Sequence, residues 1–170
     1  MKTVVLGGFM GCGKTEIGKR LSDRLGFSFI DTDEYVKELA GSSIHDMLLE
    51  GRLDRVRSLE KQAVEELCRV KNAVIATGAG VLAKEENGRV FHSVHTVVYL
   101  RRDFDTVYPV ISRDPVRVLA YGKLYTELKA LYELRDPVYE RYADITVSNN
   151  GSPEDCVREI LARLNNPVDK

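Results

Sequence analysis

The chain has 170 residues, of which 44% are hydrophobic and 30% are charged, a composition typical of one globular domain that buries about 70% of the surface its unfolded chain exposes. Its 25 basic and 26 acidic residues leave a net charge of -1, which excludes an overall positive field for holding nucleic acid or a membrane surface. The three cysteines and three histidines show neither a CxxC pair nor metal-ligand spacing, so neither a disulfide framework nor a zinc site is expected.

The first predicted element is an apolar strand at residues 3–6, into which Met1 leads directly, without a basic or long apolar leader. No later apolar segment approaches the ~20 residues that a membrane span needs. We therefore expect a cytoplasmic protein, and its size suggests a monomer.

A glycine-rich loop follows this strand and precedes a helix. Residues 8–15 read GFMGCGKT, a complete match to the phosphate-binding loop pattern of glycine, four variable residues, glycine, lysine and a hydroxyl residue. Ile17, Leu21 and Leu25, each four residues apart, predict the helix. Strand, loop and helix therefore occur in the order that binding of a nucleoside triphosphate requires.

Each fixed position of the loop has a physical reason. Gly8 and Gly13 can take backbone angles closed to other residues, so successive N–H groups can turn inward around phosphate oxygens at the positive end of the helix. Lys14 would reach the β- and γ-phosphates, and the Thr15 hydroxyl would bind Mg²⁺.

The second predicted strand, residues 27–30, ends at Asp31 and Asp33, on the edge where open α/β sheets bind ligands. Two residues apart on an extended segment, these carboxylates would project to the same side. One could then serve Mg²⁺, directly or through water, while the other hydrogen-bonds a substrate hydroxyl. The alternative is that Asp33 caps the next helix and Asp31 is only solvated.

The rest of the chain alternates helices with strands. We expect helices at about 33–40, from 42–43 onward, at about 53–70, at 103–112, from 124 to an interruption at Pro137, and after a cap at Ser152, with strands at 73–76, 96–100 and 145–147. Residues 113–123 have the proline, glycine and basic composition of a mobile lid, and the tail after Asn165 is expected to fray. The alternation predicts an α/β fold in one domain, residues 1–170, whose three layers are a five-stranded parallel sheet and helices on both its faces.

Several motifs together indicate a family. The chain lacks the NKxD motif of guanine-nucleotide switches. It carries, in order, GFMGCGKT, FIDTDEYV, GRLDRVRSLE, ATGAGVL, PVRVLA and LRDPVYERYADITV, and over almost its whole length it resembles a shikimate kinase. The resemblance implies a P-loop kinase that transfers the γ-phosphoryl group of ATP to the 3-hydroxyl of shikimate in aromatic amino-acid (chorismate) biosynthesis, with Mg²⁺ as cofactor and ATP and shikimate as partners.

The resemblance also implies roles for individual residues, with substrate-binding helices at about 33–60. Catalytic roles fall on Lys14, Asp33 and Arg117. ATP contacts fall on Gly11, Cys12, Gly13, Lys14, Thr15, Glu16, Arg113, Arg117 and Pro153. Shikimate contacts fall on Asp33, Arg57, Gly78, Ala79, Gly80 and Arg135. Mg²⁺ contacts fall on Thr15 and Asp31.

The chemistry of two of these arginines agrees with a substrate that bears a carboxylate. A planar guanidinium offers paired donors, and each charged hydrogen bond contributes roughly 1.5 to 3 kcal/mol. The alternatives are that Arg57 forms a surface pair with Glu60, and that Arg135 is a helix-terminal charge beside Asp136.

The remaining assignments also have two interpretations. Gly78 and Gly80 would let substrate approach the backbone after a buried strand, or they form a plain tight turn. Arg117 would close over the transferring phosphoryl group, or it is a solvated loop arginine.

The chain departs from the family pattern at a few positions. Ala79 stands in the middle of what are usually three glycines, Val118 replaces a proline, and Val56 replaces a phenylalanine. The arginine that sandwiches adenine would fall on Val110, so Arg113 is expected to replace it, with Pro153 on the other face of the base.

Two rival functions are a kinase for another small polyol acid, such as gluconate, and a non-catalytic ATP-binding regulator derived from a kinase. Arg57, Gly78 and Arg135 together argue against the first. Intact Lys14 and Thr15, with both aspartates of the second strand, argue against the second.

Overall fold

The computed structural model of this chain describes residues 2–165. Within them, five strands form one parallel sheet in the order β2-β3-β1-β4-β5. The strands are β1 (Val4–Gly7), β2 (Ser28–Asp31), β3 (Ala73–Ala76), β4 (Thr96–Arg101) and β5 (Ile145–Ser148). The predicted α/β fold with a five-stranded parallel sheet is confirmed.

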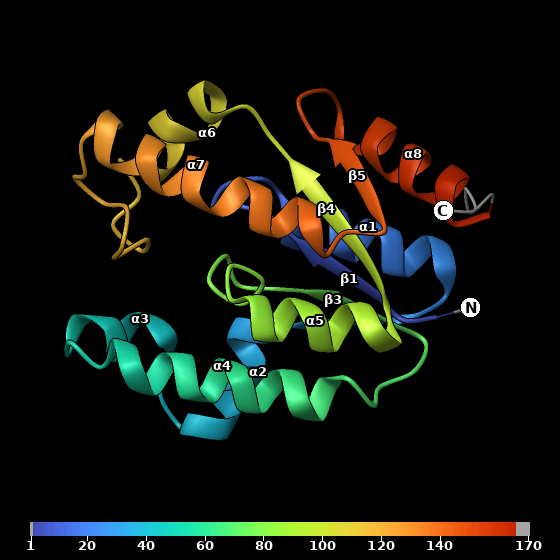
Figure 1. The fold of residues 1–170 in the computed structure, drawn as a ribbon, viewed down its shortest axis with the longest axis horizontal. Coiled ribbons are helices and arrows are strands. Elements are labelled where there is room, and N and C mark those ends of the chain that lie inside the picture. The colour runs from blue at the N-terminus through green and yellow to red at the C-terminus, as the bar shows by residue number, and fades with distance from the viewer. Residues whose placement is uncertain (1, 166–170) are drawn as a thin grey trace.

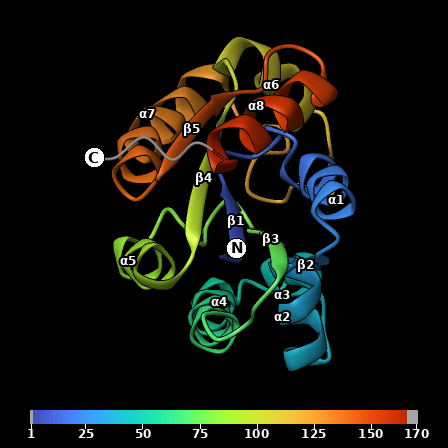
Figure 2. The same cartoon turned by 90° about the vertical axis from the view of Figure 1, so that its right-hand side faces the viewer.

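Helices cover both faces of the sheet (Figures 1 and 2). They are α1 (Lys14–Leu25), α2 (Thr32–Ala40), α3 (Ile44–Leu49), α4 (Leu53–Leu67), α5 (Glu85–Val94), α6 (Phe104–Ile111), α7 (Tyr125–Arg141) and α8 (Pro153–Asn165). Within the described part of the chain, no helix has both the length and the apolar character needed to cross a membrane.

The central strand β1 shows why helices are needed on both faces. Successive side chains of a strand point to opposite faces, so Val4 and Leu6 pack with α1 and α8, while Val5 packs in the second core cluster with α4, α5 and α7. The β1 residues Val4, Val5 and Leu6 are all fully buried, which explains the continuous apolar run in the sequence.

Helix α5 lies in a segment for which no helix was predicted. Its buried positions include Asn87 and Gly88 as well as Phe91, and the first two are not among the apolar residues by which a buried helix face is recognised in a sequence. The Asn87 side chain donates to the carbonyl of Val81 at 3.0 Å. Gly88 lies against the ring of Tyr142, which a Cβ would approach to 2.6 Å. Close packing at Asn87 and Gly88 thus adds to the apolar contact that Phe91 makes in the core.

The predicted interruption at Pro137 is wrong, because α7 continues through it to Arg141. A proline inside a helix removes one backbone hydrogen bond and costs about 3 kcal/mol. Contacts on both sides of Pro137 offset this cost. Asp136 accepts hydrogen bonds from Tyr99 and Arg101 on β4, and the buried Tyr139 donates one to the carbonyl of Ala79. These contacts join residues far apart in the sequence.

The predicted cap at Ser152 is confirmed, because its hydroxyl accepts from the backbone N–H of Asp155 at 3.1 Å and α8 begins at Pro153. The start predicted at residues 42–43 is also confirmed, with Ser43 as the N-cap of α3. The predicted fraying after Asn165 lies outside the described residues.

Candidate active site

A cavity of about 580 Å³ opens at the carboxyl edge of the sheet. Its walls come from the loop before α1, the ends of β2 and β3, helices α2, α3, α4 and α7, and residues 114–119. Parallel α/β sheets bind ligands at this edge, as the sequence predicted. Of the predicted site residues, the cavity is lined by Gly11, Gly13, Lys14, Thr15, Glu16, Asp31, Asp33, Arg57, Gly78, Ala79, Gly80, Arg117 and Arg135.

The glycine-rich loop at one end of the cavity depends on two backbone positions. Gly8 has φ 144° and Gly13 has φ 91°, angles that side-chain-bearing residues rarely adopt. A Cβ at Gly13 would also lie 2.7 Å from Nδ2 of Asn149. Gly13 is the N-cap of α1 and provides no side-chain cap, so the first turn presents its N–H groups to a ligand, as anion sites require.

Lys14 and neighbouring segments hold this loop in shape. The Lys14 ammonium donates to the carbonyls of Gly8 and Phe9, each at 2.8 Å. Asn149 donates to the carbonyl of Cys12 at 2.8 Å, and Arg102 donates to that of Gly11 at 3.3 Å. Cys12 is buried beside the loop, and the structure does not bring this predicted ATP contact to the cavity wall.

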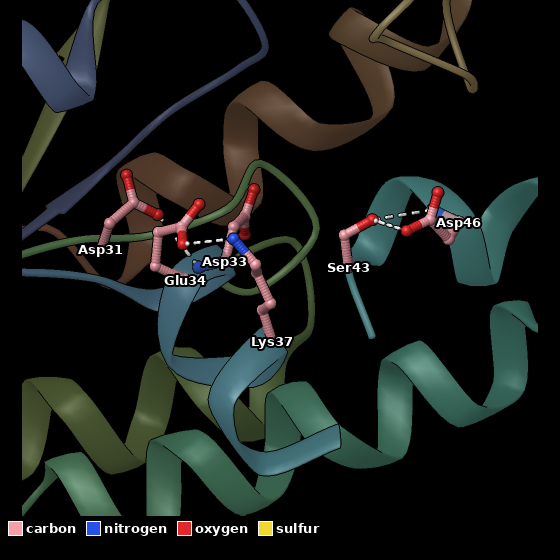
Figure 3. A network of polar contacts seen from close by, with 6 residues as sticks. All are labelled: Asp31, Asp33, Glu34, Lys37, Ser43 and Asp46. Atoms are coloured by element: carbon pink, nitrogen blue, oxygen red, sulfur yellow. Dashed lines mark hydrogen bonds and ion pairs between the residues drawn. The ribbon is translucent and has the colours of Figure 1, made fainter. Parts of the chain in front are cut away.

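Thr15 and Asp31 bring two oxygen atoms that could bind a metal ion together below the loop. The Thr15 hydroxyl donates to Oδ2 of Asp31 at 3.0 Å, while Oδ1 of Asp31 accepts from the N–H of Asp33 at 3.0 Å (Figure 3). A hydroxyl and a carboxylate suit Mg²⁺, which is usually bound through one or two protein oxygens together with substrate phosphates. These two residues therefore fit the cofactor that the sequence predicted.

The alternative in which Asp33 caps α2 is wrong. Asp31 is the N-cap, because its side chain accepts from the N–H of Asp33, and the helix already begins at Thr32. Asp33 therefore lies in the first helical turn and not on an extended segment, as the sequence interpretation assumed. Both carboxylates still reach the cavity, since the strand ends and the helix begins at its wall.

Asp33 lies among other acids at the middle of the cavity. Figure 3 shows the carboxylates of Asp31, Asp33 and Glu34 gathered at the start of α2. The surrounding protein raises the pKa of Asp33 to about 6, chiefly by removing water from the carboxyl group and next through the negative charges of Asp31 and Glu60, although Lys14 opposes the shift. Asp33 keeps contact with solvent through the cavity. It is thus a carboxyl group that changes charge near neutral pH.

The raised pKa of Asp33 predicts a pH-dependent stability change. A folded-state pKa above the unfolded value of 3.8 means that Asp33 favours the fold below about pH 4 and that this contribution is lost as the pH rises through about 6. Asp33→Asn is therefore expected to raise the melting temperature at pH 8 by about 2 °C, a small effect because solvent in the cavity screens the charge. At pH 4 the variant and the original chain should melt together.

Thermal denaturation followed by circular dichroism at both pH values checks this expectation. Glu38→Gln is the matched control, because Glu38 is an exposed carboxylate on the same helix and is not among the charges that shift the pKa of Asp33. An Asp33→Asn protein that gains no stability at pH 8, or gains as much at pH 4, would show that the Asp33 carboxylate is not destabilised in the fold.

Arg57 forms its ion pair inside the cavity wall. Its Nη1 lies 2.6 Å from Oε2 of Glu60, and the side chains are 23% and 4% exposed. The sequence alternative, a surface pair of Arg57 with Glu60, is correct about the partner. It is wrong about the location, because the pair lies in the cavity wall. A Cβ at Gly80 would lie 1.9 Å from Nη1 of Arg57, so only glycine leaves room for this guanidinium.

Arg135 reaches the cavity from the middle of α7. The alternative of a helix-terminal charge beside Asp136 is wrong, since α7 continues to Arg141 and the Asp136 carboxylate bonds Tyr99 and Arg101. Arg57 and Arg135 thus line the same cavity as the phosphate-binding loop, with Gly78, Ala79 and Gly80 on the loop after β3.

The predicted lid, residues 113–123, joins α6 to α7 and contains turns but no helix or strand. Arg117 lines the cavity, and its Nε lies 3.0 Å from Oδ2 of Asp114. Across the opening, Nδ1 of His45 on α3 lies 3.1 Å from the carbonyl oxygen of Val116. The structure brings neither Arg113, which is exposed, nor Pro153, which begins α8, to the cavity wall.

The sequence interpretation did not identify Glu60, His45 or Tyr139 as parts of this site. Glu60 could have been found from its position on the buried face of α4, one turn after Arg57. His45 and Tyr139 act through contacts with residues 71 and 60 positions away, and no local pattern indicates such contacts.

Comparisons with known proteins point to one family. A family model described as shikimate kinase matches residues 10–165. The chain is 38% identical over 165 residues to a shikimate kinase of Persephonella marina, covering 96% of this chain and 99% of the relative. It is 35% identical over 167 residues to a shikimate kinase of Enterococcus faecalis, covering 96% and 99%.

Solved structures show the same fold. A shikimate kinase from Acinetobacter baumannii, solved in complex with shikimate, matches with a TM-score of 0.90 and 29% identity, over 99% of this chain and 96% of that one. A gluconokinase from Sinorhizobium meliloti matches with a TM-score of 0.62 and 18% identity, over 96% and 91%, a likeness of fold alone. With a family match over residues 10–165 and relatives above 30% identity over nearly the whole chain, this chain belongs to the shikimate kinase family.

Proposed function

We propose that this chain transfers the γ-phosphoryl group of ATP to the 3-hydroxyl of shikimate, a step in aromatic amino-acid biosynthesis. The observation that carries the proposal is that one cavity holds a phosphate-binding loop together with two arginines, Arg57 and Arg135. A substrate that joins them must carry a hydroxyl for phosphorylation and an anionic group for the guanidinium groups. Shikimate has both.

At the nucleotide end, the loop and the start of α1 bind the phosphates of ATP. Backbone N–H groups and the Lys14 ammonium neutralise the oxygens of the β- and γ-phosphates. Thr15 and Asp31 would hold Mg²⁺, which when bound offsets the negative charge that develops on these phosphates. Arg117 stabilises the transferring phosphoryl group from the 113–123 segment, which we propose closes over the cavity and excludes water.

At the acceptor end, Arg57 and Arg135 bind the shikimate carboxylate through paired donors. Glu60 orients Arg57, because its buried carboxylate bonds one guanidinium nitrogen at 2.6 Å. Asp33 accepts a hydrogen bond from the 3-hydroxyl and directs its oxygen at the γ-phosphorus. The new O–P bond forms as the bond to the β–γ bridging oxygen breaks, the hydroxyl proton passes to the Asp33 carboxylate and from there to solvent, and ADP leaves.

Gly80→Ala tests the acceptor end. The added Cβ would meet Nη1 of Arg57 at 1.9 Å, so the guanidinium must move away from the carboxylate. We expect the KM for shikimate to rise about 10-fold or more, which is the loss of affinity expected when one hydrogen bond to a charged group is removed. The KM for ATP should change little. Steady-state kinetics with each substrate varied in turn measures both values.

Gly151→Ala is the matched control, because Gly151 has no atom within 4 Å of its Cβ position and no positive φ. A Gly80→Ala enzyme with an unchanged KM for shikimate would remove Arg57 from the binding role proposed above.

A coupled assay for ADP, with ATP, Mg²⁺ and either shikimate, gluconate or quinate, tests the function itself. We expect turnover with shikimate and little with the other two acids. Faster turnover with gluconate would favour the polyol-acid kinase. ATP binding without turnover of any acid would favour the regulator derived from a kinase.

We also infer that the protein works as a cytoplasmic monomer, without nucleic-acid or membrane partners. The near balance of its acidic and basic residues supports this. The sandwiching of adenine by Arg113 and Pro153 stays a prediction.

A further inference from the structure

Tyr139 lies behind the acceptor end of the cavity and is 2% exposed. Its hydroxyl donates to the carbonyl oxygen of Ala79 at 2.6 Å, and its ring packs against Tyr99 with centroids 5.4 Å apart. A buried carbonyl or hydroxyl without a partner is costly, so this bond joins α7 firmly to the loop after β3.

The bond also fixes the direction of a backbone N–H group. The described residues contain no cis peptide, and in a trans peptide the C=O and the following N–H point in opposite directions. Since the Ala79 carbonyl points at Tyr139, outside the cavity, the N–H of Gly80 points toward the cavity that Gly80 lines. This donor is then available to an anionic ligand.

The same hydroxyl lies beside the arginines that face this ligand. Arg135 is near enough to act on the Tyr139 hydroxyl both by its charge and by hydrogen bonding, and Arg57 also acts by its charge. Burial is the main cause that raises the pKa of Tyr139, so the hydroxyl keeps its proton at neutral pH. It therefore keeps the proton that it donates to the carbonyl oxygen of Ala79.

The position of Tyr139 is itself fixed by β4. Asp136, three residues earlier on α7, accepts from the Tyr99 hydroxyl and from Arg101. Asp136 is only 16% exposed on its side chain. Helix α7 therefore cannot slide along the sheet without breaking these charged bonds, and the Tyr139 hydroxyl has little freedom to follow a displaced loop.

We propose that Tyr139 is a positioning residue for the acceptor site: its hydroxyl holds the Ala79–Gly80 peptide and the Arg135 guanidinium in one fixed arrangement, so that both meet the shikimate carboxylate together. The proposal rests on the proposed function. Tyr139 does not touch the substrate, and its effect passes through two groups that do.

Tyr139→Phe removes the hydroxyl and keeps the ring. We expect the KM for shikimate to rise about 5- to 10-fold, as for the loss of one hydrogen bond that orients a binding group. We expect kcat and the KM for ATP to stay within about twofold, because the nucleotide end is untouched. Arg135→Ala, which removes the binding group itself, should raise the same KM further.

Tyr142→Phe is the matched control. Tyr142 lies one turn later at the end of α7, and its hydroxyl contacts Glu85 at 3.3 Å, away from the cavity. A Tyr139→Phe enzyme that melts at a lower temperature but keeps its KM for shikimate would show a purely structural role and overturn the proposal. A fall in kcat with unchanged KM would overturn it equally.

The activity of the original chain separates failure of the function from failure of this inference. If the original chain does not phosphorylate shikimate, both the proposed function and this inference are wrong. If the original chain is active but Tyr139→Phe has the same KM for shikimate, only this inference is wrong. If Tyr139→Phe does not fold, hydrogen exchange in the original chain decides. The Gly80 amide should exchange rapidly in the free protein and at least about 10-fold more slowly with shikimate, and an amide already protected without shikimate would contradict the inferred peptide orientation.

Discussion

Lys14→Ala is expected to lower kcat for shikimate phosphorylation by about 10²- to 10³-fold or more, the loss typical of one donor aimed at developing charge. The Lys14 ammonium lies at the phosphate end of the cavity, where it bonds the carbonyls of Gly8 and Phe9. In the proposed function, the same ammonium neutralises charge on the β- and γ-phosphates of bound ATP. Single-turnover and steady-state assays at saturating substrates measure the loss.

Lys19→Ala controls for a general effect of removing a lysine from α1. The Lys19 ammonium lies 5.9 Å from the centre of the Phe29 ring, outside the cavity, so its loss should leave kcat nearly unchanged. Melting temperatures of both variants show whether the loop still folds without its internal bonds. A folded Lys14→Ala enzyme with more than about a tenth of the original kcat would contradict the role given to the loop lysine.

Arg117→Ala is expected to lower kcat by about 10³-fold while the affinity for shikimate changes little. Arginines that reach a transferring phosphoryl group contribute about 10³ to 10⁵ in rate in related phosphoryl-transfer enzymes. Arg117 lines the cavity, and within the part of the chain that the structure describes its guanidinium forms one ion pair, with Asp114 at 3.0 Å on the same segment. It can therefore turn toward the γ-phosphate without breaking contacts in the core.

Measuring kcat together with shikimate binding by calorimetry checks this prediction, because the two values should respond separately. Arg158→Ala is the control, since Arg158 pairs with Asp155 on the surface of α8. Equal losses of kcat and of shikimate affinity would assign Arg117 to acceptor binding, and an unchanged kcat would leave it a solvated loop residue.

The parts of the fold that the sequence predicted depend on local patterns. The strands of a sheet buried on both faces are short apolar runs, and the phosphate-binding loop has fixed spacing and a glycine at each strained angle. Helix α5 was missed because Asn87 and Gly88 occupy its buried face. The interruption at Pro137 was wrong because Asp136 and Tyr139 bond residues of β4 and the loop after β3.

In the candidate site, too, the sequence predicted local features and missed those that depend on contacts between distant residues. The sequence offered the pairing of Arg57 with Glu60 only as a surface alternative to carboxylate binding, and only the packed structure shows that Glu60 is buried in the cavity wall and Arg57 partly so. That Asp31 and not Asp33 caps α2 follows from the residue at which β2 ends and α2 begins, and such boundaries are the least certain part of a sequence interpretation. Tyr139 could not be found at all, since its partner Ala79 is 60 residues away.

The identity of the reaction product tests the whole account most directly. A ³¹P NMR spectrum of the protein with ATP, Mg²⁺ and shikimate should show ADP and a new phosphomonoester, with the phosphorus coupled to the proton on carbon 3 of the ring. A spectrum with ADP and inorganic phosphate but no phosphorylated acid, or with the phosphoryl group on a different hydroxyl, would contradict the placement of shikimate between the loop and the two arginines.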